Sequence, residues 1–96
     1  MAKGYWVTFY RSISNPDAVA EYAKLAGPPL LAAGAKILSR GTPVKTFESG
    51  LAQRSVVIEF ESVEKAIATY QSPDYQSAAK LLKGAAERDI RILEGV

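Results

Sequence analysis

Short runs of large apolar and β-branched residues recur along the chain, separated by helix-like stretches. Three of them, residues 5–10, 35–40 and 54–61, have the composition and alternation of strands in a sheet. Residues 89–93 alternate isoleucine with charged residues and make a fourth strand. The segment 44–48 is either a short extension of the sheet or a ragged hairpin arm. The pattern therefore predicts a sheet of four main strands.

A helix-start signal follows the first strand. Asn15 can cap a helix, Pro16 suits its first position, and Asp17 complements the positive end of its dipole. We expect this helix to end at residues 27–29, a Gly-Pro-Pro sequence, because proline lacks a backbone N–H and disfavours helical conformation in the residue before it. Residues 30–33 then form a further short turn of helix.

The second half of the chain repeats this plan. Ser62 caps a helix with an apolar stripe, a second cap–proline–acid sequence restarts it at Ser72, and Gly84 ends it. Each half runs strand, helix, strand, and two such units with right-handed crossovers form the ferredoxin-like fold, β-α-β-β-α-β. We therefore predict one α+β domain over residues 1–96, with helices on one face of a four-stranded antiparallel sheet.

Both faces of the first strand are apolar. Alternation places Trp6, Thr8 and Tyr10 on one face, and Val7 and Phe9 on the other. A sheet with helices on one side only would leave the second face in water. This mismatch predicts that the open face pairs with a second copy of the chain, giving a homodimer.

The composition excludes several kinds of chemistry. The sequence has no cysteine and no histidine, which rules out disulfides, thiolate nucleophiles, histidine-dependent triads and the commonest metal ligands. We expect no metal and no cofactor. The net charge is only +2, without an arginine-rich run, so a nucleic-acid partner is not expected. No apolar stretch is long enough for a signal peptide or a membrane span, so we expect no membrane partner and a cytoplasmic location.

Short motifs spread over nearly the whole chain resemble those of a known family. They lie at residues 2–6, 15–16 leading to 22, 34 with 40–41, 48, 54–60, 72–76 and 94–95. The most specific is Ser-Pro-Asp-Tyr-Gln at 72–76, which follows a Val-Ile-Glu-Phe strand. In this order they resemble the family called domain of unknown function 1330, of the dimeric α/β-barrel superfamily. The resemblance implies a homodimer whose two sheets face each other around a barrel-like interior, and it implies no established reaction.

Candidate ligand-binding residues follow from the expected register of the open face. Arg11, Arg40 and Glu59 lie there among apolar residues; a carboxylate between arginines stays ionised, and a free arginine can bind an anion with two hydrogen bonds. Glu48, beside a turn, and Tyr75, near a helix start, could reach the mouth of the same cleft. The alternatives are an inert interface ion pair at Glu59, a solvated Glu48, and a core Tyr75 with a hydrogen-bonded hydroxyl.

The remaining arginines and aromatic residues have plainer interpretations. Arg54, Arg88 and Arg91 are expected to be solvated charges near strand ends. Tyr22 and Tyr70 are expected in the core on the helix side, or at its rim.

Three functions fit this set of features. The first is a small homodimer that binds a small organic ligand, anionic or neutral, in a cleft at the sheet face. The second is a structural or regulatory dimerisation module without catalysis. The third is a cofactor-independent enzyme comparable to monooxygenases or isomerases of the superfamily, with Glu59 as base and Arg11 or Arg40 stabilising a developing anion. Whether the protein is an enzyme stays open; a cavity of ~300 Å³ or more with converging polar groups would favour ligand binding.

Overall fold

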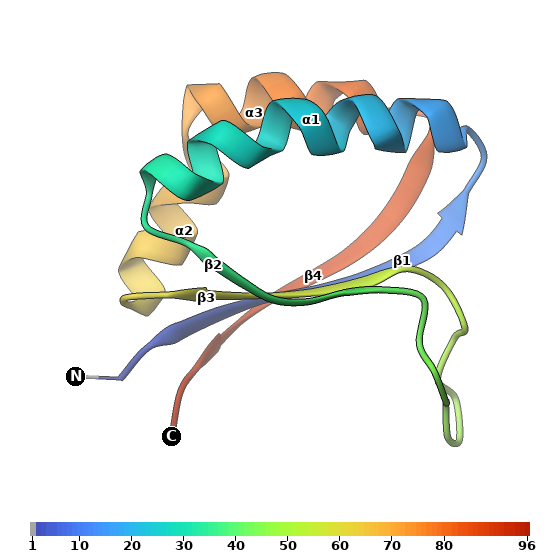
Figure 1. Cartoon of the computed structure of the whole chain (residues 1–96), viewed down its shortest axis with the longest axis horizontal. Coiled ribbons are helices and arrows are strands. Elements are labelled where there is room, and N and C mark those ends of the chain that lie inside the picture. Colours follow the sequence, from blue (N-terminus) through green and yellow to red (C-terminus); the bar gives the residue numbers. More distant parts are fainter. Residues whose placement is uncertain (1) are drawn as a thin grey trace.

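The computed structural model describes residues 2–96 and has two layers, with the helices packed on one face of the sheet (Figure 1). The elements, in chain order, are β1 (Gly4–Ile13), α1 (Pro16–Ala32), β2 (Lys36–Gly41), β3 (Ser55–Phe60), α2 (Val63–Gln71), α3 (Pro73–Ala79), the 3₁₀ turn η1 (Lys80–Leu82) and β4 (Ala86–Glu94). The strand order is β2-β3-β1-β4, and every neighbouring pair is antiparallel. The predicted α+β ferredoxin-like fold is confirmed.

The helices begin where the sequence predicts. The side chains of Asn15, Ser62 and Ser72 each accept a hydrogen bond from the backbone N–H three residues further on, at 3.1–3.3 Å. These bonds satisfy N–H groups that have no partner inside the helix. The Ser72 hydroxyl also donates to the carbonyl of Thr69 at 2.7 Å. One residue therefore ends α2 and begins α3.

The predicted break in the first helix is wrong, because α1 continues through Pro28 and Pro29 to Ala32. The residue before a proline avoids helical conformation mainly because its Cβ and N–H meet the proline ring, and Gly27 has no Cβ. Ala26 and Leu30, one turn apart, are both buried against the core. Packing on this face outweighs the backbone hydrogen bonds that the prolines remove.

The core beneath the helices is aromatic. The Trp6 ring stacks on Phe60 with 5.8 Å between centroids and meets the edges of Tyr70 and Tyr75 at 5.5 and 4.9 Å. Trp6, Phe60 and Tyr75 are the largest fully buried side chains among the described residues. Tyr75 and Trp6 are therefore core residues on the helix side of the sheet.

The connection between β2 and β3 contains no strand, so residues 44–48 do not extend the sheet. In Figure 1 this green connection extends from the sheet on the side opposite the helices. It carries three exposed apolar side chains, Val44, Phe47 and Leu51. The sheet adds exposed Phe9, Leu38 and Leu93.

Candidate functional site

A cavity of about 60 Å³ lies between α1 and the sheet. Part of its wall is aromatic, from Trp6, Tyr10 and Tyr22, and small and aliphatic residues of α1, β2 and β3 form much of the rest. The indole N–H of Trp6 donates to the Thr8 hydroxyl at 2.9 Å, so it is already satisfied within the protein. The cavity is thus largely apolar with a few polar groups, as small-molecule sites are, but its volume of about 60 Å³ is well below the ~300 Å³ that would favour ligand binding.

The charged residues in the cavity lining are all arginines. Arg40 from β2, Arg54 from just before β3 and Arg88 from β4 contribute to it, and no Asp or Glu of residues 2–96 does so. Positive charge in a partly enclosed space attracts an anion more strongly than the same charge in open water. The electrostatics of the cavity therefore favour a negatively charged occupant.

Arg88 is held by phenol groups and has no ion-pair partner in the described part of the chain. Its Nη1 donates to the hydroxyl of Tyr22 at 3.1 Å and to that of Tyr75 at 3.0 Å. Its guanidinium carbon lies 5.0 Å from the centre of the Tyr22 ring and 6.0 Å from that of Tyr10. Aromatic faces and hydroxyl groups stabilise this cation without neutralising its charge.

The two tyrosines that hold Arg88 also contact each other. Tyr22 Oη and Tyr75 Oη lie 2.5 Å apart, a short hydrogen bond. Burial raises the pKa of Tyr75 far above its ordinary value, so this hydroxyl stays protonated. The same cause raises the pKa of Tyr10. The cavity therefore offers donors and positive charge, and its lining among the described residues has no carboxylate to act as a base.

The sequence predicted Arg40 on the open face, and this prediction is wrong. Ile37 pairs with Ile58 and Ser39 with Val57, so Leu38 is an extra residue that shifts the register of β2. Arg40 then pairs with Val56, which faces the helices. A one-residue shift exchanges the two faces of a strand, and here it brings Arg40 to the cavity.

Glu59 is on the open face, but its partners differ from those expected. It accepts a hydrogen bond from the Tyr5 hydroxyl at 3.3 Å and lies 3.7 Å from the ammonium group of Lys3. Neither Arg11 nor Arg40 pairs with it. Glu59 therefore lies on the opposite face of the sheet from the cavity.

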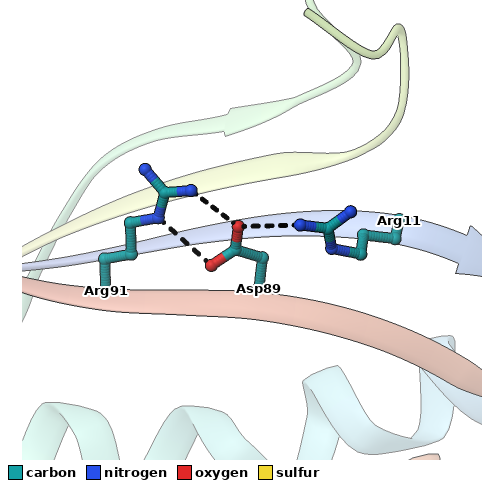
Figure 2. A network of polar contacts seen from close by, with 3 residues as sticks. All are labelled: Arg11, Asp89 and Arg91. Carbon is teal, nitrogen blue, oxygen red and sulfur yellow. Dashed lines mark hydrogen bonds and ion pairs between the residues drawn. The ribbon is translucent and has the colours of Figure 1, made fainter.

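The carboxylate between two arginines is Asp89, as Figure 2 shows. Arg91 binds it through two hydrogen bonds of 2.9 and 3.2 Å, and Arg11 lies 3.6 Å away. The hydrogen bonds from Arg91 hold the pKa of Asp89 below its ordinary value, and the charges of Arg91 and Arg11 add to this effect. Arg11 is on the open face as predicted, in a solvated cluster.

Glu48 and Tyr75 lie in different environments, and neither is at a cleft on the open face. Glu48 occupies an exposed turn with a φ of 52°, a conformation that most residues avoid, and it is not part of the cavity lining. The Tyr75 hydroxyl is buried under α1 beside Arg88 and not at the open face. Of the five predicted site residues, only Arg40 and Tyr75 belong to the cavity or to the polar group behind it.

The sequence interpretation placed Tyr22 correctly on the helix side, but it did not assign Tyr22, Arg54 or Arg88 to a site. Arg88 was expected to be solvated, yet it lies two residues before Ile90 in β4 and so on the same face as that core residue. The same period-2 pattern would have found it. Tyr22 lies one helical turn before Ala26 and so faces the sheet with it.

Comparison with known proteins agrees with this fold. The family described as Domain of unknown function (DUF1330) matches residues 3–96. The chain belongs to the DUF1330 family. A search of curated proteins finds no match to this DUF1330 domain. None of the helices within residues 2–96 is both long and apolar enough to cross a membrane, and in the same part of the chain no three Asp or Glu side chains gather as a metal site.

Three solved structures are similar to this DUF1330 domain. A protein of unknown function from Rhodopseudomonas palustris is 17% identical, with a TM-score of 0.73 and coverage of 99% of this chain and 83% of that chain. A dimeric ferredoxin-like protein of unknown function from Thermobifida fusca is 14% identical, with a TM-score of 0.64 and coverage of 97% and 91%. A protein from Caulobacter crescentus, described as a proposed antibiotic biosynthesis monooxygenase, is 14% identical, with a TM-score of 0.60 and coverage of 99% and 90%. Similarity at these identities shows the ferredoxin-like fold alone.

Proposed function

We propose that this protein binds a small organic anion in the cavity between α1 and the sheet. The observation that carries the proposal is that Arg40, Arg54 and Arg88 line the cavity and that no carboxylate of residues 2–96 lines it with them. Arg54 and Arg88 are half-buried and Arg40 is exposed, so two of the three cations are partly withdrawn from water, which is costly without full compensation. A bound anion supplies that compensation. The proposal moves the site from the open face, where the sequence placed it, to the helix side.

The apolar walls account for the organic part of the ligand. Ala26, Leu30, Ile37 and Ile58 contribute carbon atoms to the lining, opposite the aromatic rings. Burial of apolar ligand atoms against such walls stabilises a complex by about 25 cal/mol per Å². A carboxylate on a short carbon skeleton therefore fits the cavity better than a fully polar anion.

The active form in this proposal is a homodimer that pairs through the open face. Exposed Phe9, Leu38 and Leu93 on that face support it, because apolar side chains gathered on one face mark interaction surfaces. The similar protein from Thermobifida fusca is described as dimeric. Pairing through this face leaves the cavity, which lies on the helix side, outside the interface.

The test is an NMR titration with matched pairs of ligands. Acetate, propionate and benzoate are compared with acetamide, propionamide and benzamide, which have similar shapes and no charge. Arg40→Gln and Arg54→Gln remove charge from the cavity. Arg11→Gln and Glu59→Gln change charges on the opposite face and serve as controls. NMR is suitable because ligands of so few atoms bind weakly.

We expect the carboxylates to shift resonances of cavity residues, and the amides not to do so. Each cavity variant should weaken binding about tenfold or more, since a hydrogen bond to a charged group contributes about 1.5–3 kcal/mol. The controls should bind as the wild type does. Equal binding of acids and amides, or binding unaffected by both cavity variants, would contradict the proposal. A protein that binds none of the acids is better described as a dimerisation module.

A cofactor-independent oxygenase is the second candidate. The observation in its favour is the similarity to the Caulobacter crescentus protein described as a proposed monooxygenase. Because the described lining of the cavity has no carboxylate base, the substrate would have to enter as an anion and supply its own electrons. Oxygen consumption in the presence of a ligand identified by NMR would support this candidate.

A further inference from the structure

The hydrogen bonds among Arg88, Tyr22 and Tyr75 can be assigned a direction by counting protons. Arg88 Nη1 carries two hydrogens, and it donates one to each tyrosine oxygen. Each hydroxyl has one proton, and the two oxygens share one hydrogen bond of 2.5 Å. One of the two hydroxyl protons is therefore used between the tyrosines, and the other remains to be donated elsewhere.

Burial decides which proton remains. Tyr75 is 0% exposed and does not line the cavity, and Tyr22 Oη is the only acceptor for its hydroxyl among the side-chain contacts of residues 2–96. If Tyr22 were the donor, the Tyr75 proton would be buried without a partner, which is costly. Tyr75 therefore donates to Tyr22.

The free proton consequently belongs to Tyr22, a half-buried residue that lines the cavity. Its oxygen accepts hydrogen bonds from both Arg88 and Tyr75. Hydrogen bonds received by a hydroxyl oxygen polarise its O–H bond and strengthen it as a donor. The network thus provides one strengthened donor, on a residue that lines the cavity together with three arginines.

The cavity is only partly enclosed, so its volume sets how much of a ligand it can bury. A site needs about 10–15 Å³ of this kind of volume for each water-sized group. A cavity of about 60 Å³ then holds roughly four to six such groups. Acetate, propionate and lactate are of this size, whereas benzoate is larger.

Building on the anion-binding function proposed above, we propose that the cavity takes a short-chain carboxylate of about four to six non-hydrogen atoms, and that the Tyr22 hydroxyl is the donor that binds one of its carboxylate oxygens. Tyr75 is a positioning residue, which directs the Tyr22 proton without contacting the ligand. The proposed ligand class thus changes from small organic anions in general to short-chain carboxylic acids.

The experiment compares Tyr22→Phe with Tyr75→Phe by NMR titration with acetate, propionate, benzoate and inorganic phosphate. Each variant loses one hydroxyl of the same hydrogen-bonded pair, so each controls for the other. Urea unfolding of both variants separates stability from binding. If Tyr22→Phe does not fold, the double variant Tyr22→Phe/Tyr75→Phe is compared with Tyr75→Phe alone. The double variant leaves no buried tyrosine hydroxyl without a hydrogen-bond partner.

We expect Tyr22→Phe to weaken acetate and propionate binding roughly ten- to a hundredfold. Tyr75→Phe should weaken binding about threefold, less than Tyr22→Phe does, because the Tyr22 donor remains but loses the hydrogen bond that directs and polarises it. Stability should fall as well, because a buried hydrogen bond is lost. Short acids should bind more tightly than benzoate and phosphate. Equal losses in the two variants, no loss in Tyr22→Phe, or tighter binding of benzoate or phosphate would overturn this inference.

These results are distinguishable from a failure of the proposed function. Acetate binding that depends on Arg54 but not on Tyr22 overturns the role of Tyr22 alone. Tight, Arg54-dependent binding of benzoate overturns the size limit alone. Absence of any arginine-dependent binding of acids overturns both proposals.

Discussion

Gly4→Ala should destabilise the protein strongly, because β1 begins in direct contact with the start of α2. A Cβ added at Gly4 would lie 2.5 Å from the carbonyl oxygen of Ser62, 2.7 Å from its carbonyl carbon and 2.7 Å from the nitrogen of Val63. Ordinary contacts of a Cβ begin near 3.4 Å. The added methyl group would therefore overlap three backbone atoms by 0.7–0.9 Å, and backbone cannot move aside as a flexible side chain does.

The size of the effect follows from what must shift. Overpacking in a well-packed region costs about 1–3 kcal/mol. Moving Ser62 also endangers the N-cap of α2, where its hydroxyl accepts from Lys65 N at 3.1 Å, and a lost cap costs about 0.5–2 kcal/mol. We expect a decrease in the free energy of unfolding of about 2–4 kcal/mol. For a domain of this size that corresponds to roughly 10–30 °C in Tm.

The assay is urea unfolding followed by the fluorescence of Trp6, the single tryptophan of the chain. Protein concentration is held constant, because the proposed dimerisation would make stability depend on concentration. Lys3→Ala, at the neighbouring exposed position, is the control and should change stability by less than about 1 kcal/mol. A Gly4→Ala protein within about 0.5 kcal/mol of the wild type would refute the inferred close contact between β1 and α2.

Two further predictions concern the open face. Sedimentation equilibrium of the wild type should give twice the 10.3 kDa mass of the chain. Phe9→Glu should give the mass of a single chain, because a charge replaces an exposed apolar residue of that face. A monomeric wild type would contradict the dimer. Asp89→Asn should be less stable than the wild type at neutral pH, because Arg91 lowers the pKa of Asp89 in the folded chain. The difference should shrink below about pH 4, where the carboxylate becomes protonated in the unfolded chain. It should vanish as the pH falls further and the carboxylate of the folded chain is protonated too. A difference that grows on acidification would contradict that sign.

The fold could be predicted because local and periodic signals agree along most of the chain. Caps at Asn15, Ser62 and Ser72 mark three helix starts, and each cap forms its predicted hydrogen bond. The alternation in β1 assigned Trp6 to the core and Phe9 to the open face correctly. These features depend on neighbours within a few residues, which a sequence displays directly.

The site could not be predicted in the same way, because it depends on contacts between distant segments. The extra residue in β2 follows from pairing with β3 and has no local marker, so Arg40 was assigned to the wrong face. The continuation of α1 through Pro28 depends on packing of the helix against the sheet. Arg88 is the exception, since its phase with Ile90 was readable in the sequence.

The extra residue at Leu38 has a consequence for how such a domain can diverge. β2 is the edge strand of the sheet, and five of its six residues are exposed. Deleting one residue there would turn Arg40 outward and leave the core strands β1 and β3 in register. A single-codon insertion or deletion at this margin would therefore alter the charge that lines the cavity while sparing the hydrophobic interior. The electrostatic character of the cavity can thus change through the edge of the sheet without any change at its centre.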